Sequence, residues 1–169
     1  MKRSRIAGIL SFFLALAPAL ANAGMFSVSA KKANVRSGPG TQYEVLWYIW
    51  KHEPLQSLRH SGPWTEVRDF EGYTGWIYSS LLSDYPSVVV IAKAANIRSG
   101  PSARFDIVWE VDRGVTFQVR SVKGRWIEVY DEGGDDAVTG WIHRSLVWGN
   151  LLLKEKEDEA YLDETMNRI

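Results

Sequence analysis

The chain has 169 residues, with 20 Lys and Arg, 20 Asp and Glu, and no cysteine. The lack of cysteine excludes disulfides and a thiol nucleophile, so packing alone must hold the fold. Residues 24–148 carry 14 basic and 14 acidic side chains, whereas residues 149–169 carry 3 and 6. This neutral main body argues against nucleic acid as a partner.

The first 23 residues predict a cleaved secretory signal peptide. A basic head of Lys2, Arg3 and Arg5 precedes an apolar run over 6–17, and Ala-Asn-Ala follows at 21–23. This order is typical of export signals, and cleavage is expected before Gly24. The apolar run is short for a mature spanning helix and no second run follows it. We therefore expect an exported protein, periplasmic or secreted, with no membrane span after cleavage.

Short segments rich in β-branched and aromatic residues follow along the chain, with turn residues between them. Outside the signal and the tail, no segment keeps a helical period, so the pattern predicts an all-β fold. The expected strands cover 26–30, 44–50, 54–58, 64–67 and 75–78, and then 87–92, 106–111, 116–122, 125–130 and 140–143.

These two series of strands are copies of one another. ANVRSGPG at 33–40 returns as ANIRSGPS at 95–102, and aligning 33–68 with 95–130 gives 12 identities in 36 positions. The sequence thus predicts two small β-barrels in tandem, over 24–84 and 85–148, with the link SDYPS at 83–87 between them.

The tail at 149–169 is acidic. Leu162, Met166 and Ile169 have helical spacing there. The stripe favours a short helix, although it is too brief to hold a helix by itself.

The repeated eight residues predict a turn. Glycine followed by proline favours a sharp turn, and the asparagine before them can tie the loop to the backbone through its amide. The residues assigned to this structural role are Asn34, Gly38, Pro39, Asn96, Gly100 and Pro101.

The same stretch also carries an arginine that the turn does not require. Arg36 and Arg98 alternate with the inward Val35 and Ile97, so they are expected to point away from the core. Each could bind a ligand carboxylate through its guanidinium fork or pair with a nearby acid such as Glu44 or Asp106. Both interpretations stay open from the sequence.

Aromatic residues at equivalent places follow the turn in both copies. We expect them to lie at a groove and, with Arg36 and Arg98, to form the candidate ligand site: Tyr43, Trp47, Phe105 and Trp109. Four other tryptophans lie in alternating strand patterns, so they are expected in the core or as plugs at the barrel ends: Trp64, Trp76, Trp126 and Trp141.

Several motifs together resemble the bacterial SH3-like domain, SH3b. The first copy has NVRSGPG, an aromatic residue four positions after Pro39, W-x-x-V at 64–67 and GWIYSSLL at 75–82. The second has NIRSGPS, WIEV and GWIHRSLV. The pair, over residues 26–148, resembles exported tandem SH3-like proteins of Gram-negative bacteria. The resemblance implies SH3-like barrels that bind wall peptides or protein partners and that accompany cell-wall enzymes.

No group of residues in the sequence matches a catalytic or metal motif. His52, Glu53 and His60 lack the spacing of a zinc helix, and His143 has no acidic partner nearby. The acids at 131, 135 and 136 are more typical of a solvated hairpin tip than of a calcium loop. These observations predict a protein that is not an enzyme, with no cofactor and no metal.

Three functional hypotheses follow for an exported pair of barrels. The first is a module that binds peptidoglycan stem peptides, with aromatic contacts and arginine recognition of carboxylates. The second is a periplasmic scaffold that binds an envelope protein. The third is an accessory subunit of a cell-wall hydrolase.

Overall fold

The computed structural model describes residues 24–131 and 138–151. The predicted signal peptide, the acids at 135 and 136 and most of the predicted tail lie outside these ranges. Among the described residues, no helix has the length and hydropathy needed to cross a membrane.

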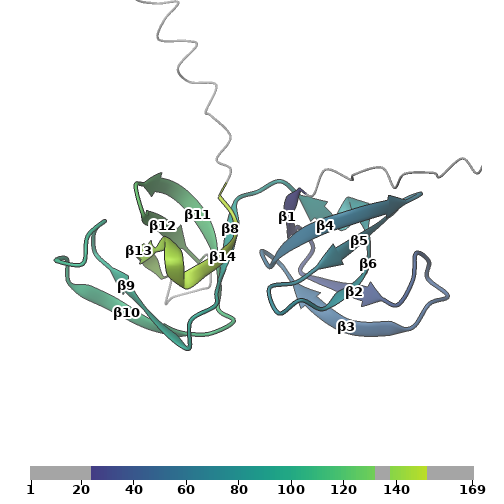
Figure 1. The fold of residues 1–169 in the computed structure, drawn as a ribbon, viewed down its shortest axis with the longest axis horizontal. Coiled ribbons are helices and arrows are strands. Elements are labelled where there is room, and N and C mark those ends of the chain that lie inside the picture. Colours follow the sequence, from purple (N-terminus) through teal and green to yellow (C-terminus); the bar gives the residue numbers. More distant parts are fainter. Residues whose placement is uncertain (1–23, 132–137, 152–169) are drawn as a thin grey trace, which may run out of the picture.

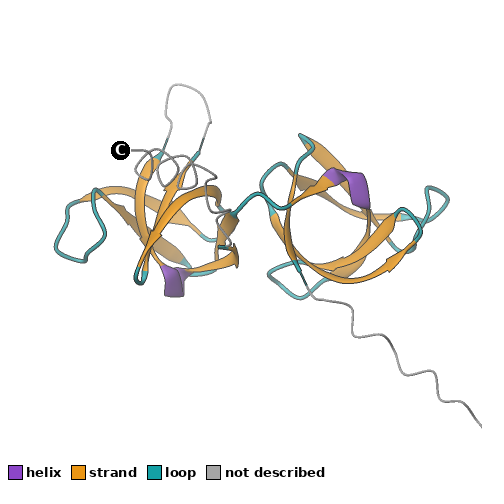
Figure 2. Cartoon of the chain, turned by 90° about the horizontal axis from the view of Figure 1, so that it is seen from above, coloured by secondary structure: helices purple, strands orange, loops and turns teal. Residues whose placement is uncertain are grey.

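The protein is all-β, as the strand pattern predicts, and forms two barrel-like domains side by side (Figure 1). From above, the strands of the first domain curl into a ring (Figure 2). Its elements are β1 (Met25–Val28), β2 (Lys32–Arg36), β3 (Val45–Trp50), β4 (Pro54–Ser61), β5 (Trp64–Arg68), β6 (Thr74–Tyr78), the 3-10 helix η1 (Ser79–Leu81) and β7 (Leu82–Ser83). Those of the second are β8 (Ser87–Val90), β9 (Ala94–Arg98), β10 (Ile107–Asp112), β11 (Thr116–Lys123), β12 (Trp126–Tyr130), β13 (Thr139–His143), the 3-10 helix η3 (Arg144–Leu146) and β14 (Val147–Asn150).

The two sheets have the same topology. The strand order is β3-β2-β6-β5-β4-β1-β7 in the first and β10-β9-β13-β12-β11-β8-β14 in the second. All strand pairs are antiparallel, and the register of β4 with β5 shifts at the place equivalent to the shift between β11 and β12. The duplication seen in the sequence is therefore a duplication of the fold. β14 also extends the second sheet to Asn150, two residues into the segment assigned to the tail.

Each domain has its own apolar core. In β2, Ala33 and Val35 are buried while Asn34 and Arg36 are half-buried, which is the alternation expected of a strand with one face on a core. Leu55 of the first domain and Phe117 of the second occupy equivalent positions and are almost fully buried. Trp64 and Trp76 are mostly buried, whereas Trp126 and Trp141 are half-buried.

The domains meet at a junction between β1 and β4 of the first and β8 and β14 of the second. Ser27 Oγ lies 2.5 Å from Ser87 Oγ and donates to the Tyr85 carbonyl at 2.6 Å. Asn150 Nδ2 donates to the carbonyl of Asp84 at 3.2 Å. These bonds tie the link to both sheets.

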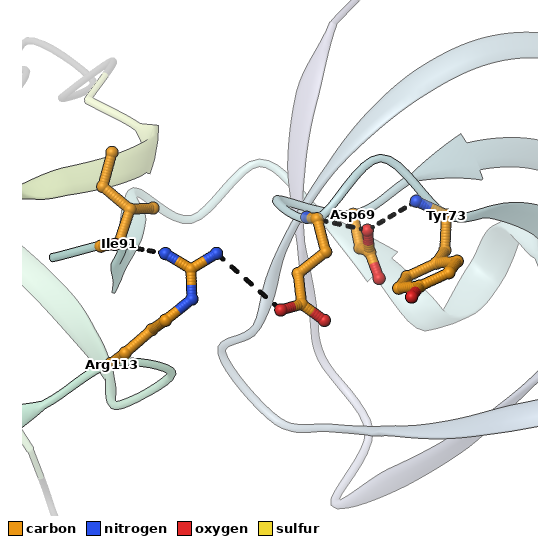
Figure 3. A network of polar contacts seen from close by, with 5 residues as sticks. Asp69, Tyr73, Ile91 and Arg113 are labelled. Carbon is orange, nitrogen blue, oxygen red and sulfur yellow. Dashed lines mark hydrogen bonds and ion pairs between the residues drawn. The ribbon is translucent and has the colours of Figure 1, made fainter. Parts of the chain in front are cut away.

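Arg113 forms a second contact across the junction (Figure 3). Its guanidinium donates to the Ile91 carbonyl of its own domain, lies 3.7 Å from a carboxylate oxygen of Glu71, and stands 5.1 Å from the ring centre of Phe70. Asp69 holds the hairpin that presents these two residues, because its Oδ1 accepts 2.9 Å bonds from the backbone nitrogens of Glu71 and Tyr73.

Candidate functional site

The loop after β2 is compact because an aromatic ring packs directly on its glycine. A Cβ built on Gly38 would lie 2.5 Å from Cδ1 of Tyr43, and one on Gly100 would lie 2.7 Å from Cδ1 of Phe105. Neither glycine has a positive φ. The close approach of the ring, rather than a special backbone angle, therefore explains why these positions are glycine, which corrects the turn argument made from the sequence.

Alanine at Gly38 is expected to destabilise the first domain by about 1–3 kcal/mol, because the new Cβ must displace the ring of Tyr43. Thermal melts of the single variants and of the Gly38→Ala/Tyr43→Ala double variant measure this. In the Tyr43→Ala background, where the ring is absent, Gly38→Ala should destabilise the domain by less than about 0.5 kcal/mol. An equal cost in both backgrounds would show that the ring is not the cause.

Both arginines hold this loop through backbone carbonyls. Arg36 Nη1 donates to the carbonyls of Thr41 at 3.1 Å and Tyr43 at 2.8 Å, and Arg98 Nη1 donates to the carbonyl of Phe105 at 2.8 Å. Neither forms the ion pair with Glu44 or Asp106 that the sequence left open. These bonds involve Nη1 alone, so the Nε and Nη2 donors of each fork remain for a ligand.

Beside each arginine lies an open groove. The groove of the first domain has a volume of about 340 Å³ and that of the second about 550 Å³. Groove 1 is lined by Lys32, Ala33, Asn34, Arg36, Thr41, Trp64, Tyr78 and Leu81. Groove 2 is lined by Ala94, Ala95, Asn96, Arg98, Ala103, Glu110, Trp126, His143, Ser145 and Leu146.

Every lining position of groove 1 has a counterpart among the residues that line groove 2. An asparagine, an arginine and a tryptophan recur in both, and the leucine of the 3-10 helix closes each end. The amides of Asn34 and Asn96 make no side-chain hydrogen bond within the described residues. Residues assigned to the turn therefore contribute polar groups to the grooves.

A cross-strand aromatic pair forms one wall of each groove. Trp64 and Tyr78 are partners between β5 and β6, with ring centres 5.4 Å apart and planes at 81°. Trp126 and His143 repeat this edge-to-face arrangement at 5.3 Å and 80°. This wall was not predicted from the sequence, because the tryptophans were expected in the core or at the barrel ends and His143 matched no motif. Their matched places at the start of one strand and the end of the next were the available signal.

The two grooves differ in charge. Groove 1 has Lys32, whose Nζ stands 3.6 Å from the ring centre of the exposed Tyr48. The residues equivalent to Lys32 and Tyr48 in the second domain are Ala94 and the acidic Glu110, and both of them line groove 2. The first groove is thus cationic and aromatic, whereas the second combines an arginine with an acid.

The aromatic residues predicted for the site do not line the grooves. Tyr43 and Phe105 pack on the loop glycines and are 42% and 47% exposed. Trp47 packs partly against the first core and lies near Tyr73, and Trp109 is exposed on β10. Of the predicted ligand residues, the structure brings only Arg36 and Arg98 into the grooves. The role of all six in binding stays a prediction.

No group of three or more His, Asp or Glu side chains in the described ranges is arranged to hold a metal ion. His60 bonds instead to the hydroxyl of Thr65 at 3.0 Å. His143 Nδ1 lies 2.8 Å from Ser145 Oγ, which orients its ring at the edge of groove 2.

Comparison with known proteins gives two matches to one family model and several partial relatives. The model described as "Bacterial SH3 domain" matches residues 29–84 and 92–149. The protein named "Putative N-acetylmuramoyl-L-alanine amidase YrvJ" of Bacillus subtilis is 23% identical over 131 residues, which are 71% of this chain and 24% of that protein. "Probable cell wall amidase LytH" of Staphylococcus epidermidis is 28% identical over 67 residues, 38% of this chain and 23% of the relative.

Solved structures with a similar arrangement include NlpC1 from Trichomonas vaginalis, at 16% identity and a TM-score of 0.35, covering 94% of this chain and 58% of that one. An NlpC/P60 family protein from Bacillus cereus has 12% identity and a TM-score of 0.35, covering 83% of this chain and 63% of that one. At these scores the similarity carries no conclusion about function.

The names of the relatives contradict the prediction that the protein is not an enzyme. The curated relatives in which these domains recur are named as amidases, which points to an enzyme. This chain spans at most 24% of the length of those two relatives. The activity of the whole relatives therefore comes to this chain only as a proposal.

Proposed function

Because this chain belongs to the bacterial SH3 domain family, which matches it twice, we propose that it works at the cell wall, outside the cytoplasm. Its two grooves bind peptidoglycan peptides and present them to an amide-cleaving reaction of the kind for which the relatives are named. The chain is then also expected to be exported, because peptidoglycan lies beyond the membrane.

The recurrence of one groove in both domains is the observation that supports this proposal most. β2 and its copy β9 differ at two of their five positions, yet both place an asparagine and an arginine at the groove. Holding the loop engages Nη1 of each arginine, so the fold alone does not require the remaining donors beside an amide and an aromatic wall. A peptide with carboxylates and amides has groups that match all three.

The chemistry of each groove suits an extended peptide. The aromatic wall offers apolar contact area to a side chain or to the peptide plane, and the amide can pair with a peptide N–H or carbonyl. The free donors of the arginine can hold a carboxylate in bidentate geometry. Lys32 adds positive charge to groove 1 alone.

Removing the residue that pairs with the tryptophan in each aromatic wall is expected to weaken binding to purified sacculi. Tyr78→Ala and His143→Ala should each lower the affinity about tenfold, because aromatic residues at the centre of a contact commonly contribute about 1–2 kcal/mol or more. Cosedimentation with sacculi measures the affinity, and thermal melts measure folding.

Tyr73→Ala is the matched control, since Tyr73 is 63% exposed and lies outside both grooves. Amide cleavage is measured separately, as the release of new peptide amino termini from the sacculi. The measurement is made with the chain alone and with an added wall amidase. Unchanged sacculus binding by both groove variants would exclude the grooves as the wall site.

The protein-binding hypothesis has one observation in its favour. β3 is an outer strand of its sheet, and its outward side chains Leu46, Tyr48 and Trp50 are about half exposed. The equivalent positions on β10 are Val108, Glu110 and Asp112. An extended segment of an envelope protein could add to this edge of the first domain only. Tyr48→Ser would then reduce capture of envelope protein while leaving sacculus binding unchanged.

A further inference from the structure

A separate cavity lies at the junction of the two domains. It has a volume of about 290 Å³ and receives residues from both sheets and from the link. This junction cavity is lined by Val28, Ser29, Lys51, His52, Ser83, Tyr85, Gln118 and Tyr130. None of these residues lines a groove. Its size is at the lower end of small-molecule sites, which suits a ligand of one or two amino-acid residues.

One wall of the junction cavity holds a buried donor with no acceptor. Gln118 is only 9% exposed, and its Oε1 accepts a bond from the hydroxyl of Tyr130 at 2.9 Å. Its Nε2 has no hydrogen-bond partner within residues 24–131 and 138–151. A buried amide donor without a partner costs about 1–3 kcal/mol, so it favours an acceptor from outside.

The lining of the junction cavity also contains a residue whose backbone conformation favours glycine. His52 has a φ of +70°, and it is the one non-glycine residue with a positive φ in the described part of the chain. The equivalent residue of the second domain is Gly114, with a φ of +89°. A positive φ at a residue other than glycine persists only where the surrounding structure holds it, and such residues cluster at ligand sites. At position 52 that side chain faces the cavity.

The charged lining of the cavity is positive. Lys51 stands beside His52 at the turn between β3 and β4, and the described lining includes no acid. Glu53 follows them in sequence, but its carboxylate accepts a bond from the backbone nitrogen of Trp50. Burial raises the pKa of Glu53, and Glu53 is not among the residues that line the cavity.

We propose that the junction cavity binds the carboxylate end of a short peptide, with the Gln118 amide and Lys51 as its donors. The peptide would contact both domains at once and so stabilise their junction. This site is independent of the grooves, and it does not rest on the function proposed for them.

Titration of the full chain with N-acetyl-Ala-Ala, and with the same peptide carrying a C-terminal amide, tests the proposal by NMR shifts and calorimetry. The acid should bind at least about tenfold more tightly than the amide. Gln118→Glu keeps an acceptor for Tyr130 and replaces the donor by an acceptor, so it should weaken binding of the acid at least about tenfold.

His52→Gly separates binding from folding. Glycine adopts the observed φ without strain, so the Tm should be equal to or higher than that of the parent. Because the variant removes an imidazole from the cavity lining, binding of the acid should weaken at least about threefold. The groove variant Tyr78→Ala should bind the dipeptide as the parent does. No saturable binding by the parent up to about 10 mM, or equal binding by the parent, Gln118→Glu and His52→Gly, would overturn the proposal.

Discussion

Gly149→Ala is expected to destabilise the second domain by on the order of 3–5 kcal/mol, a large part of the stability of a small domain. Gly149 lies in β14 with a φ of +149°, and its Cβ would overlap the carbonyl oxygen of Ser87 and lie 2.8 Å from Cα of Val88. Both atoms belong to the backbone of β8, so they cannot turn away as a side chain would. Urea unfolding followed by tryptophan fluorescence measures the loss.

The control for this variant is Gly124→Ala in the same domain. Gly124 also has a positive φ, +61°, but no atom beyond its own chain neighbours lies within 4 Å of the place that an alanine methyl group would take there. Gly124→Ala should lower the free energy of unfolding by only about 1–2 kcal/mol, because the left-handed backbone conformation is its only source of strain. Similar costs for the two variants would show that the close approach of β8 is not what requires glycine at 149.

Phe117→Ala is expected to cost about 3–5 kcal/mol, and Leu55→Ala about 2–5 kcal/mol. The two residues occupy the same position in the two cores and are 2% and 0% exposed, so each truncation leaves a cavity that the surrounding strands cannot fill. Amide hydrogen exchange reports each domain separately. The loss of protection should be confined mainly to the domain that carries the variant.

Val122→Ala is the control for these core variants, because Val122 is 36% exposed near the end of β11. It should change the unfolding free energy by less than about 1 kcal/mol. A loss of protection that spreads equally over both domains in Phe117→Ala would mean that the junction makes them one cooperative unit.

The architecture could be predicted from the sequence because it depends on local patterns that occur twice. Alternation around Val35 and Ile97, the repeated turn and the Gly-Trp pairs indicate strands and a duplication, and the two sheets have identical strand order. The predicted bounds are wrong by one or two residues at the ends of some segments, as at β14. Pairing there depends on β8, which no local pattern reveals.

The candidate site could be predicted only in part. The outward direction of Arg36 follows from strand alternation, and the structure places it in a groove. Its bonds to loop carbonyls could not be predicted, because backbone carbonyls do not vary with sequence. Trp64 was assigned to the core because it is large and apolar, and it is mostly buried, yet one side lines the groove. The junction cavity requires the docking of two domains, which the pattern of each domain alone does not determine.

The positions of the two 3-10 helices have a consequence for valency. Figure 2 shows η1 and η3, in purple, on opposite sides of the long axis of the molecule. Each carries the leucine that closes its groove, Leu81 in one and Leu146 in the other. If the grooves bind wall peptides as proposed, sites marked by helices on opposite sides would be poorly placed to bind neighbouring peptides of one straight strand, because avidity is lost where geometry forbids simultaneous engagement. Such sites would instead suit cross-linking, with one strand of a layered polymer bound on each side of the chain.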